Sequence, residues 1–350
     1  MKPHVIVLQI VLGCSRSRTE LHLNPDPGGY NFTSRVIVGT ISAVENTAHD
    51  DGLSTFESVR PRLFGIAYRM LGSASEAEDI VQDAWLRWQG TDRNTVVDPP
   101  AFLATATTRL AITFAQSARS RHETYVGPWL PEPVDTSNDP RLGAERAEAL
   151  EFAVLLLLEK LSPTERAAYI LREAFDYSYD QIAHIIRSSE ANARQLVTRA
   201  RKHISDGRRK AVSSSEQKRL LNAFIVASQK GDLPALEKLF ASDVVSYADG
   251  GGAVHVARLP VSGRDRVAKY TASVWPIAWT GVTPEWVEAN GQASVLMLLG
   301  GVPMALLTVE ASEEGIVSIL LMARPSKLAA IWRSTETKRA SQSLSQTAPG

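Results

Sequence analysis

The sequence predicts a multidomain protein in which two all-α domains precede an α+β domain. Up to about residue 210, apolar residues recur at helical spacing, and Ser-x-x-Glu or Ser-x-x-Gln helix starts interrupt the pattern. Beyond residues 213–215, strand-like runs replace most of the helical pattern, which indicates a sheet with helices at one side. The length of 350 residues also exceeds what one typical domain needs.

The composition is that of a soluble globular protein, with 44% hydrophobic and 22% charged residues. The 38 basic and 38 acidic residues balance, so any affinity for nucleic acid must come from a local patch. Cys14 is the only cysteine, which excludes an intrachain disulfide and a thiolate zinc cluster, and the seven histidines show no metal-ligand spacing. We therefore expect no metal and no cofactor. The strongest basic run consists of Arg199, Arg201, Lys202, Arg208, Arg209 and Lys210.

Residues 1–52 are predicted to form a disordered N-terminal extension. The apolar run at residues 5–12 is far too short to span a bilayer, and residues 11–14 resemble a lipoprotein processing site only faintly. We expect a cytoplasmic protein that has no membrane partner.

Residues 53–122 are predicted to be the first helical domain. Its first helix carries Pro61, which should kink the helix or mark its start. Its second helix begins with the capping box Ser73 to Glu76, and its outward face could dock a basic partner or be ordinary solvated surface. The third helix runs from residue 98 to about 118, and the basic residues and aromatics beyond it suit either single-stranded DNA or loop packing. The outward face of the second helix consists of Asp79, Gln82, Asp83 and Leu86.

Residues 123–143 are predicted to be a linker, because they are rich in Pro, Gly and Asp. Residues 127–133 are too apolar for a free tether, so we expect them to dock on another surface. A helix over residues 144–161 then opens the second helical domain, residues 144–210.

The second helical domain has a helix-turn-helix pattern. Helices start at the capping boxes of Ser162 and Ser178 and again near Ser188 or Ser189. One face of the last helix is apolar, and the other carries amide and guanidinium groups of the kind that pair with base edges and phosphates. The alternative is a solvated face of an ordinary bundle helix. The apolar face consists of Ala193, Leu196, Val197, Ala200 and Ile204.

Residues 216–333 are predicted to be the α+β domain. Two helices over residues 216–229 and 233–241 precede strands near 244–248, 282–289, 293–299, 304–309 and 316–322, with a further helix over 264–278. Asn290-Gly291 is a hairpin turn signal, because both residues tolerate positive φ. Residues 334–350 are rich in Ser, Thr and Gln and are predicted to be a disordered tail.

Two blocks of this sequence resemble a known family. Residues 64–73 (FGIAYRMLGS) and 76–88 (EAEDIVQDAWLRW) resemble domain two of extracytoplasmic-function sigma factors, and residues 161–204 resemble domain four. The linker motif WLPEP at 129–133 and the DGGG run at 249–252 are similar to those of the subgroup with a fused C-terminal SnoaL-like domain, the sigma factor J type. The resemblance covers about residues 53–333, and the combination of motifs is more specific than any one of them.

The resemblance implies a non-enzymatic role in which the protein directs core RNA polymerase to promoter DNA and initiates transcription. The outward face of the second helix, Asp79, Gln82, Asp83 and Leu86, would bind core polymerase. Arg109, Arg119 and Arg121 would bind the minus-ten element. Asn192, Arg194, Gln195, Arg199, Arg201 and Lys202 would bind the minus-thirty-five element in the major groove. Trp129, Leu130, Pro131, Glu132 and Pro133 would meet Asp249, Gly250, Gly251 and Gly252 in a regulatory contact between domains.

The chain departs from the family pattern at three places. Thr113-Phe114-Ala115-Gln116 stands where the family usually has charged residues of the Asp-Arg-Leu-Arg kind, which removes positive charge from the expected DNA site. Ala253 follows the glycine run in place of Lys, and Ala293 replaces the Pro of Asn-Gly-Gln-Pro. The last two changes fall in the fused domain and predict altered regulatory contacts there.

Three functions are open for the fused domain. Some relatives of the SnoaL-like fold, a cone with a pocket, are enzymes, and Asp243, Asp249 or His255 could act as a general base. Against this, Asp249 could simply cap the glycine turn and His255 could lie on a strand. A small-molecule ligand in the pocket is a second possibility, and a regulatory protein contact is the one that we favour. The alternatives for the whole chain are a helix-turn-helix regulator with a ligand-sensing SnoaL-like domain, and an isomerase or cyclase with a DNA-binding appendage.

Overall fold

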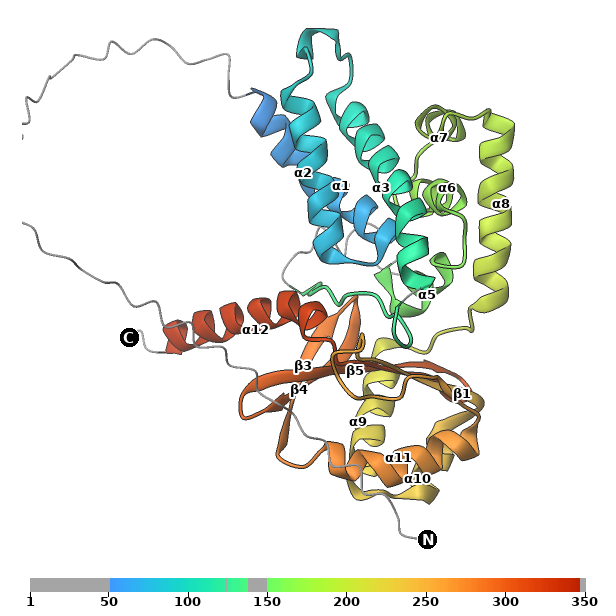
Figure 1. Ribbon diagram of the computed structural model, residues 1–350, viewed down its shortest axis with the longest axis vertical. Helices are drawn as coiled ribbons and strands as arrows, with labels where there is room; N and C mark the ends of the chain where they lie inside the picture. The colour runs from blue at the N-terminus through green and yellow to red at the C-terminus, as the bar shows by residue number, and fades with distance from the viewer. Residues whose placement is uncertain (1–50, 124, 138–149, 347–350) are drawn as a thin grey trace, which may run out of the picture. The chain divides into compact units, whose positions relative to one another are not determined.

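The computed structural model describes residues 51–123, 125–137 and 150–346, and the side chains of residues 51, 118–123 and 341–346 are outside the description. The predictions for residues 1–50 and for residues 138–149 therefore lie outside the described residues. Figure 1 shows the order of the described elements along the chain. No helix in the described part of the chain is both long and apolar enough to cross a membrane.

The first helical domain consists of α1 (Asp51–Leu71), α2 (Ala74–Gln89), a short 3-10 helix η1 (Arg93–Thr95) and α3 (Pro99–Glu123). Pro61 lies inside α1 and does not mark its start, because the helix begins ten residues earlier. The Trp88 indole N–H donates to the Gly52 carbonyl at 2.8 Å, which holds the first turn of α1 against α2. As predicted, Ser73 caps α2.

The helix-turn-helix domain consists of α5 (Phe152–Leu158), α6 (Pro163–Glu173), α7 (Tyr179–Ile186) and α8 (Glu190–Gly207). Both predicted capping boxes are present, at Ser162 and at Ser178, and Ser189 caps α8. The predicted helix over residues 144–161 is represented by α5, which ends before residue 161. All five residues of the predicted apolar face of α8 are buried.

The two helical domains share one hydrophobic core. Phe175, which follows α6, packs on Gly65 of α1, where an added Cβ would lie 3.3 Å from the ring. Arg62 of α1 donates to the Phe175 carbonyl at 3.1 Å, and Arg166 of α6 donates to the Met70 carbonyl at 2.5 Å. Residues from both domains, Leu63 and Met70 together with Leu158 and Leu171 among them, belong to a single buried cluster.

The α+β domain contains a six-stranded mixed sheet with the order β2-β1-β6-β5-β4-β3. The β1 and β6 strands are parallel, and the other neighbouring strands are antiparallel. The five predicted strands are present, and the two-residue β2 was not predicted. The elements are α9 (Ser214–Lys230), α10 (Leu233–Leu239), β1 (Phe240–Asp249), β2 (Val261–Ser262), α11 (Arg264–Ala278), β3 (Val282–Ala289), β4 (Gln292–Leu299), β5 (Val302–Ser312), β6 (Gly315–Met322) and α12 (Pro325–Gln346).

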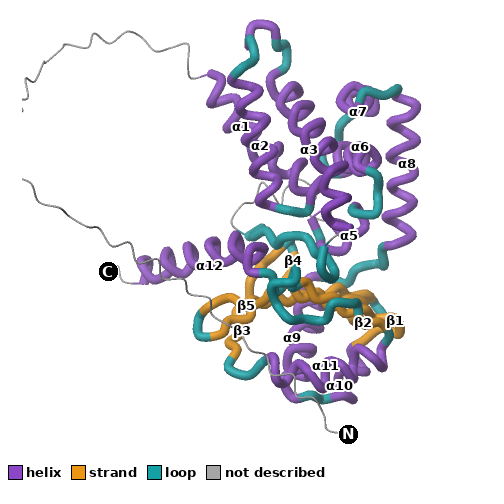
Figure 2. Tube along the Cα trace, viewed as in Figure 1, coloured by secondary structure: helices purple, strands orange, loops and turns teal. Residues whose placement is uncertain are grey.

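Both faces of this sheet are apolar and covered. Because side chains alternate along a strand, Val295 and Met297 of β4 face one layer while Leu296 and Leu298 face the other. Helices α9, α10 and α11 cover the first face, as Figure 2 shows. The second face is covered by α12 and by three residues from outside the domain, Leu130, Phe152 and Leu156.

The prediction of a disordered tail from residue 334 is wrong for residues 334–346, which belong to α12. Ser334 donates to Asp135 of the linker at 2.5 Å, and Lys338 binds the same carboxylate at 2.6 Å. Thr335 is buried and donates to the Ile331 carbonyl. The polar composition suggested disorder because it does not reveal that the linker supplies partners for this helix.

Candidate nucleic-acid interface and docking surfaces

The predicted docking face of α2 is fully exposed. The four side chains of this face are all solvent-exposed, and 56% of the surface of Leu86 is accessible to solvent. They are Asp79, Gln82, Asp83 and Leu86. These positions lie on one side of the helix because they are three or four residues apart. The structure therefore brings three polar side chains and one uncovered leucine together, as the sequence predicts.

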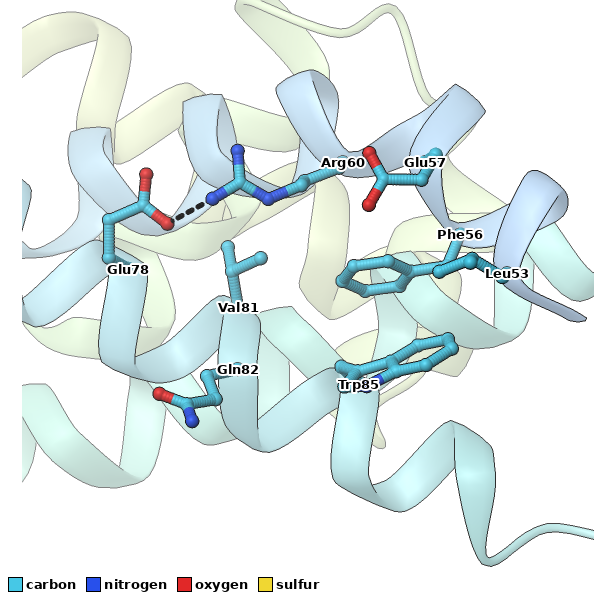
Figure 3. Close-up of a pocket in the computed structure, with 8 residues that line it drawn as sticks. All are labelled: Leu53, Phe56, Glu57, Arg60, Glu78, Val81, Gln82 and Trp85. Atoms are coloured by element: carbon cyan, nitrogen blue, oxygen red, sulfur yellow. Dashed lines mark hydrogen bonds and ion pairs between the residues drawn. The ribbon is translucent and has the colours of Figure 1, made fainter. Parts of the chain in front are cut away.

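A groove of about 310 Å³ lies beside this face, between α1 and α2. Figure 3 shows the ring of Phe56 close to that of Trp85, and their centroids are 4.8 Å apart. The Arg60–Glu78 ion pair, 2.5 Å long, lies at one end, and Gln82 belongs to both the groove and the docking face. The groove has no signature in the sequence, because it depends on how α1 packs against α2.

Arg109 of α3 does not face solvent as a free DNA-binding side chain would. Its guanidinium donates to the Ile185 carbonyl at 2.8 Å and to the His184 carbonyl at 2.9 Å, at the C-terminal end of α7. Burial and the neighbouring Arg187 lower its pKa. Arg119 and Arg121 lie in α3, but their side chains are outside the description. In this arrangement Arg109 makes a contact between the two helical domains, and its minus-ten contact stays a prediction.

The predicted reading face of α8 is exposed along its length. Asn192, Arg194, Gln195, Arg199, Arg201 and Lys202 are all solvent-exposed. Several of them have partners within the domain. Arg194 pairs with Glu190, Arg199 with Glu165 at 3.1 Å and Arg201 with Glu173 at 2.7 Å. The arginines of these pairs are exposed, whereas Glu165 and Glu173 keep only 18% and 24% of their side-chain surface. Ion pairs near the surface contribute little to stability, typically less than about 1 kcal/mol.

The basic run splits into two parts with different partners. Arg208 pairs with Glu151 at 3.0 Å, and Lys210 pairs with Glu313 of the α+β domain at 3.1 Å. Arg209 binds both Asp243 and Glu314 of that domain. Arg209 and Lys210 therefore fasten the helix-turn-helix domain to the α+β domain, and Arg208 joins the two ends of the helix-turn-helix domain. The three basic residues within α8 remain on its exposed face.

Asp249 is the centre of the contact between the linker and the α+β domain. The residue is fully buried, and its carboxylate accepts from the Tyr125 hydroxyl at 2.6 Å and from the Leu130 N–H at 2.9 Å. Lys327 of α12 completes the cluster with an ion pair of 2.7 Å. The Lys327 ammonium also donates to the Leu130 carbonyl and lies 4.5 Å from the centroid of the Trp129 ring. Burial lowers the pKa of Lys327, and the charge of Asp249 opposes that shift.

The glycine run beside Asp249 allows the linker to approach closely. A Cβ on Gly251, which has φ of +55°, would lie 2.8 Å from the Tyr125 hydroxyl. The Trp129 ring rests in the same way on Gly72, at the end of α1. Small residues on both sides therefore admit the aromatic side chains of the linker.

Asn290 of the α+β domain contacts both helical domains and the linker. Its side chain is fully buried and donates to the Tyr68 hydroxyl at 2.7 Å and to the Leu150 carbonyl at 2.9 Å. Its amide oxygen accepts from the Val134 N–H at 3.0 Å. The turn signal identified this residue, which has φ of +55°, but not these long-range partners. Tyr68, with its pKa raised by burial, also donates to the Glu132 carbonyl at 2.6 Å.

The comparisons with known proteins agree with this organisation. Sigma-70 region 2 matches residues 55–121, and sigma-70 region 4 matches residues 151–204. The chain is 37% identical over 225 residues to the ECF RNA polymerase sigma factor SigJ of Mycobacterium tuberculosis, covering 62% of this chain and 71% of that protein. This chain belongs to the extracytoplasmic-function (ECF) RNA polymerase sigma factors.

Two further comparisons cover most of this sigma factor. It is 30% identical over 284 residues to the probable ECF RNA polymerase sigma factor SigI of Mycobacterium tuberculosis, which is 80% of this chain and 96% of that protein. The crystal structure of Mycobacterium tuberculosis SigJ superposes with a TM-score of 0.65 at 30% identity, covering 79% of this chain and 98% of that one. Because that structure is covered almost completely, the likeness extends beyond regions 2 and 4. The C-terminal helices and mixed sheet fit a SnoaL-like α+β cone, and the resemblance identified in the sequence is confirmed.

The three candidate bases in the fused domain of this sigma factor have different surroundings. Asp243 is exposed and pairs with Arg209, and His255 lies in an exposed loop rather than on the predicted strand. Asp249 does not merely cap the glycine turn, because the linker and Lys327 engage its carboxylate. The sheet face beneath α9 and α11 is filled by the buried rings of Phe224, Phe240, Trp275 and Trp279. A small-molecule ligand in the pocket of the SnoaL-like domain stays a prediction.

Proposed function

We propose that this sigma factor binds core RNA polymerase through the exposed face of α2 and promoter DNA through α8 and the end of α3. The observation that carries the α2 assignment is the uncovered Leu86 among Asp79, Gln82 and Asp83. An apolar side chain surrounded by acids fits a basic partner with an apolar anchor. Polymerase would carry out the chemistry, while the sigma factor would supply position and strand separation.

We assign the minus-thirty-five element to the exposed face of α8. Asn192 and Gln195 can make bidentate hydrogen bonds with adenine, and Arg199 can bind a phosphate or a guanine. Glu165 and Glu173, which pair with Arg199 and Arg201, leave the side-chain amides of Asn192 and Gln195 exposed. This arrangement resembles other helix-turn-helix proteins, which place their last helix in the major groove.

We further propose that the arrangement described here is a resting state. Two N–H groups of Arg109 donate to the carbonyls of α7, so only the remaining ones are available to a promoter phosphate. A minus-ten contact through the whole guanidinium would require α3 to leave α7, and the shared core around Phe175 would have to open. Such opening exposes apolar surface, so it needs the interaction energy of polymerase and DNA to offset it.

The fused domain would control this opening through the linker. Trp129 and Leu130 connect two domains: the ring of Trp129 rests on Gly72 of the first helical domain, and Leu130 is buried among residues of the sheet and α12 of the α+β domain. A linker held on both sides restricts how far the two helical domains can separate. This role follows from the contacts of Asp249 and Lys327 and needs no small-molecule ligand.

The decisive experiment for the sigma function is reconstitution with purified core polymerase. We expect the full chain to co-purify with core enzyme and to support run-off transcription from a subset of a promoter library. Leu86→Arg should abolish both while the circular dichroism spectrum is unchanged. Binding to bare duplex DNA with no association with core polymerase would contradict the proposal and favour a helix-turn-helix regulator.

A second experiment tests the role of the linker. Trp129→Ala should increase run-off transcription at limiting core polymerase, because it removes the contact with Gly72 and Lys327. Trp286→Ala is the control, since it also removes an indole ring, from β3 of the α+β domain, where the residue is 39% exposed. Transcription that is unchanged or reduced, with the protein still folded, would show that the linker does not restrain opening.

A further inference from the structure

Glu310 is a buried carboxylate where the α+β domain meets the helix-turn-helix domain. It lies on β5, and only 8% of the residue is exposed. The N–H of Ala153, in the first turn of α5, donates to its Oε1 at 3.1 Å. Gln292 on β4 donates to Oε2 at 3.2 Å. One side chain of the α+β domain therefore holds the start of the helix that opens the helix-turn-helix domain.

Two charged groups face Glu310 from the other domain. Glu151 directly precedes α5, and Arg208 directly follows α8, and they pair with each other at 3.0 Å. Burial raises the pKa of Glu310 to about 7, and the negative charge of Glu151 adds to the effect. Gln292, the Ala153 N–H and Arg208 act in the opposite direction but do not cancel it. In the packed arrangement, neighbouring groups therefore stabilise the negative charge of an ionised Glu310 only in part.

The same contact continues along the segment that leaves α8. Arg209 pairs with Asp243 and Glu314, and Lys210 pairs with Glu313. The Val212 N–H donates to the carbonyl of Ala311, the residue after Glu310, at 3.4 Å. The segment after the DNA-reading helix α8 is therefore fastened to the strand that carries Glu310.

We propose that Glu310 makes the contact between the α+β domain and the helix-turn-helix domain respond to pH. The contact takes up one proton at Glu310 and tightens as the medium becomes more acidic, and it loosens when Glu310 ionises beside Glu151. Gln292 and the Ala153 N–H hold the carboxyl in place in both states.

The direction follows from the difference between the packed and the separated states. In a separated state Glu310 would meet water and titrate near its usual pKa of 4.5, whereas in the packed state its pKa is about 7. The packed state therefore binds the proton more tightly, and the contact strengthens as the pH falls from about 7 toward 4.5. Above pH 7 both states are ionised and the dependence disappears. Between pH 7.5 and pH 5.5 the docking equilibrium constant should rise about twenty-fold.

The effect on transcription rests on the proposed function, because a tighter contact would hold the sigma factor in the resting state. The titration itself does not depend on polymerase or DNA. A failure of the pH response and a failure of the proposed function are therefore distinguishable.

The first test measures the carboxyl of Glu310 directly in the full-length protein. Selective ¹³C labelling of glutamate and the variant Glu310→Gln identify its resonance, which should titrate with a midpoint near pH 7. A midpoint below about pH 5.5 would overturn the proposal, since the packed carboxyl would then be ionised under all relevant conditions. This measurement uses the wild-type residue, so it does not depend on how the variant folds.

The second test measures the contact between the domains. Cysteines introduced by Asp206→Cys and Lys238→Cys, in a Cys14→Ser background, carry a donor and an acceptor dye on exposed positions of α8 and α10. Energy transfer should increase between pH 7.5 and pH 5.5. Glu310→Gln, which stays neutral and keeps its size, should give the high value at every pH, whereas the control Glu237→Gln on α10 should respond like the parent. Equal pH dependence in the parent and in Glu310→Gln would overturn the proposal.

Discussion

Asp249→Asn should loosen the linker from the α+β domain by removing one charge. In the parent protein the fully buried carboxylate faces the Lys327 ammonium at 2.7 Å, and only 4% of the Lys327 side chain is exposed. The asparagine keeps the shape, but only one of its two polar atoms accepts hydrogen bonds, because the amide nitrogen is a donor. It leaves the buried ammonium without a counter-ion, and the Tyr125 hydroxyl and the Leu130 N–H must share one acceptor oxygen.

The size of the effect follows from the burial of both partners. Breaking a buried ion pair by removing one member typically costs about 3–5 kcal/mol, because an uncompensated charge remains inside. Removing both members should cost less, so Asp249→Asn combined with Lys327→Met is expected to recover roughly 1–3 kcal/mol relative to Asp249→Asn alone. The exposed pair of Arg219 with Glu216 offers a contrast, and Arg219→Ala should leave the urea midpoint unchanged within error.

Urea denaturation followed by tryptophan fluorescence measures these free energies of unfolding. Limited proteolysis at pH 7.5 gives a second readout, since released residues 125–137 should be cleaved faster in Asp249→Asn. Two results would refute the reasoning. One is a loss below about 1 kcal/mol for Asp249→Asn. The other is a double variant in which the costs of the two changes simply add, so that it is less stable than Asp249→Asn alone. Either result would mean that the Asp249–Lys327 pair does not hold the linker.

Four further predictions concern the other surfaces. Leu86→Arg should weaken binding to core polymerase at least a hundredfold, by about 3 kcal/mol, as expected for a central anchor, whereas Val97→Arg should not weaken it. Equal losses of affinity for the two variants in a pull-down titration would refute the α2 assignment. Arg199→Ala should lower affinity for promoter DNA and reduce the slope of log K against log salt by about 0.9, and an unchanged slope in fluorescence anisotropy would exclude a phosphate contact. Asn290→Ala should lower the free energy of unfolding by roughly 3 kcal/mol through unpaired buried groups, and Asn94→Ala should leave it unchanged within error. Raising NaCl from 50 to 500 mM should increase the protease sensitivity of residues 208–212, because their ion pairs are partly exposed and screened by salt. Cleavage rates that do not change with NaCl would contradict that explanation.

Local signals account for most of the elements that were predicted correctly. The capping boxes at Ser162 and Ser178 and the cap at Ser73 are short-range hydrogen bonds, so residue types three positions apart are enough to predict them. The apolar face of α8 and the exposed face of α2 follow from helical periodicity in the same way. These features could be predicted because they depend only on neighbours along the chain.

The sequence by itself therefore determined the capped helix starts at Ser73, Ser162 and Ser178, the exposed face of α8, and the fold class of two helical domains followed by an α+β domain. The tertiary structure alone decided the partners of Arg109, Asp249, Asn290 and Glu310, because each of them bonds to residues about 75 to 220 positions away. It also decided that residues 334–346 form part of a helix, since Asp135 of the linker provides the partner for Lys338. A polar side chain has the same short-range signature in water or in a buried contact, so only the folded chain shows which polar groups are paired across domains.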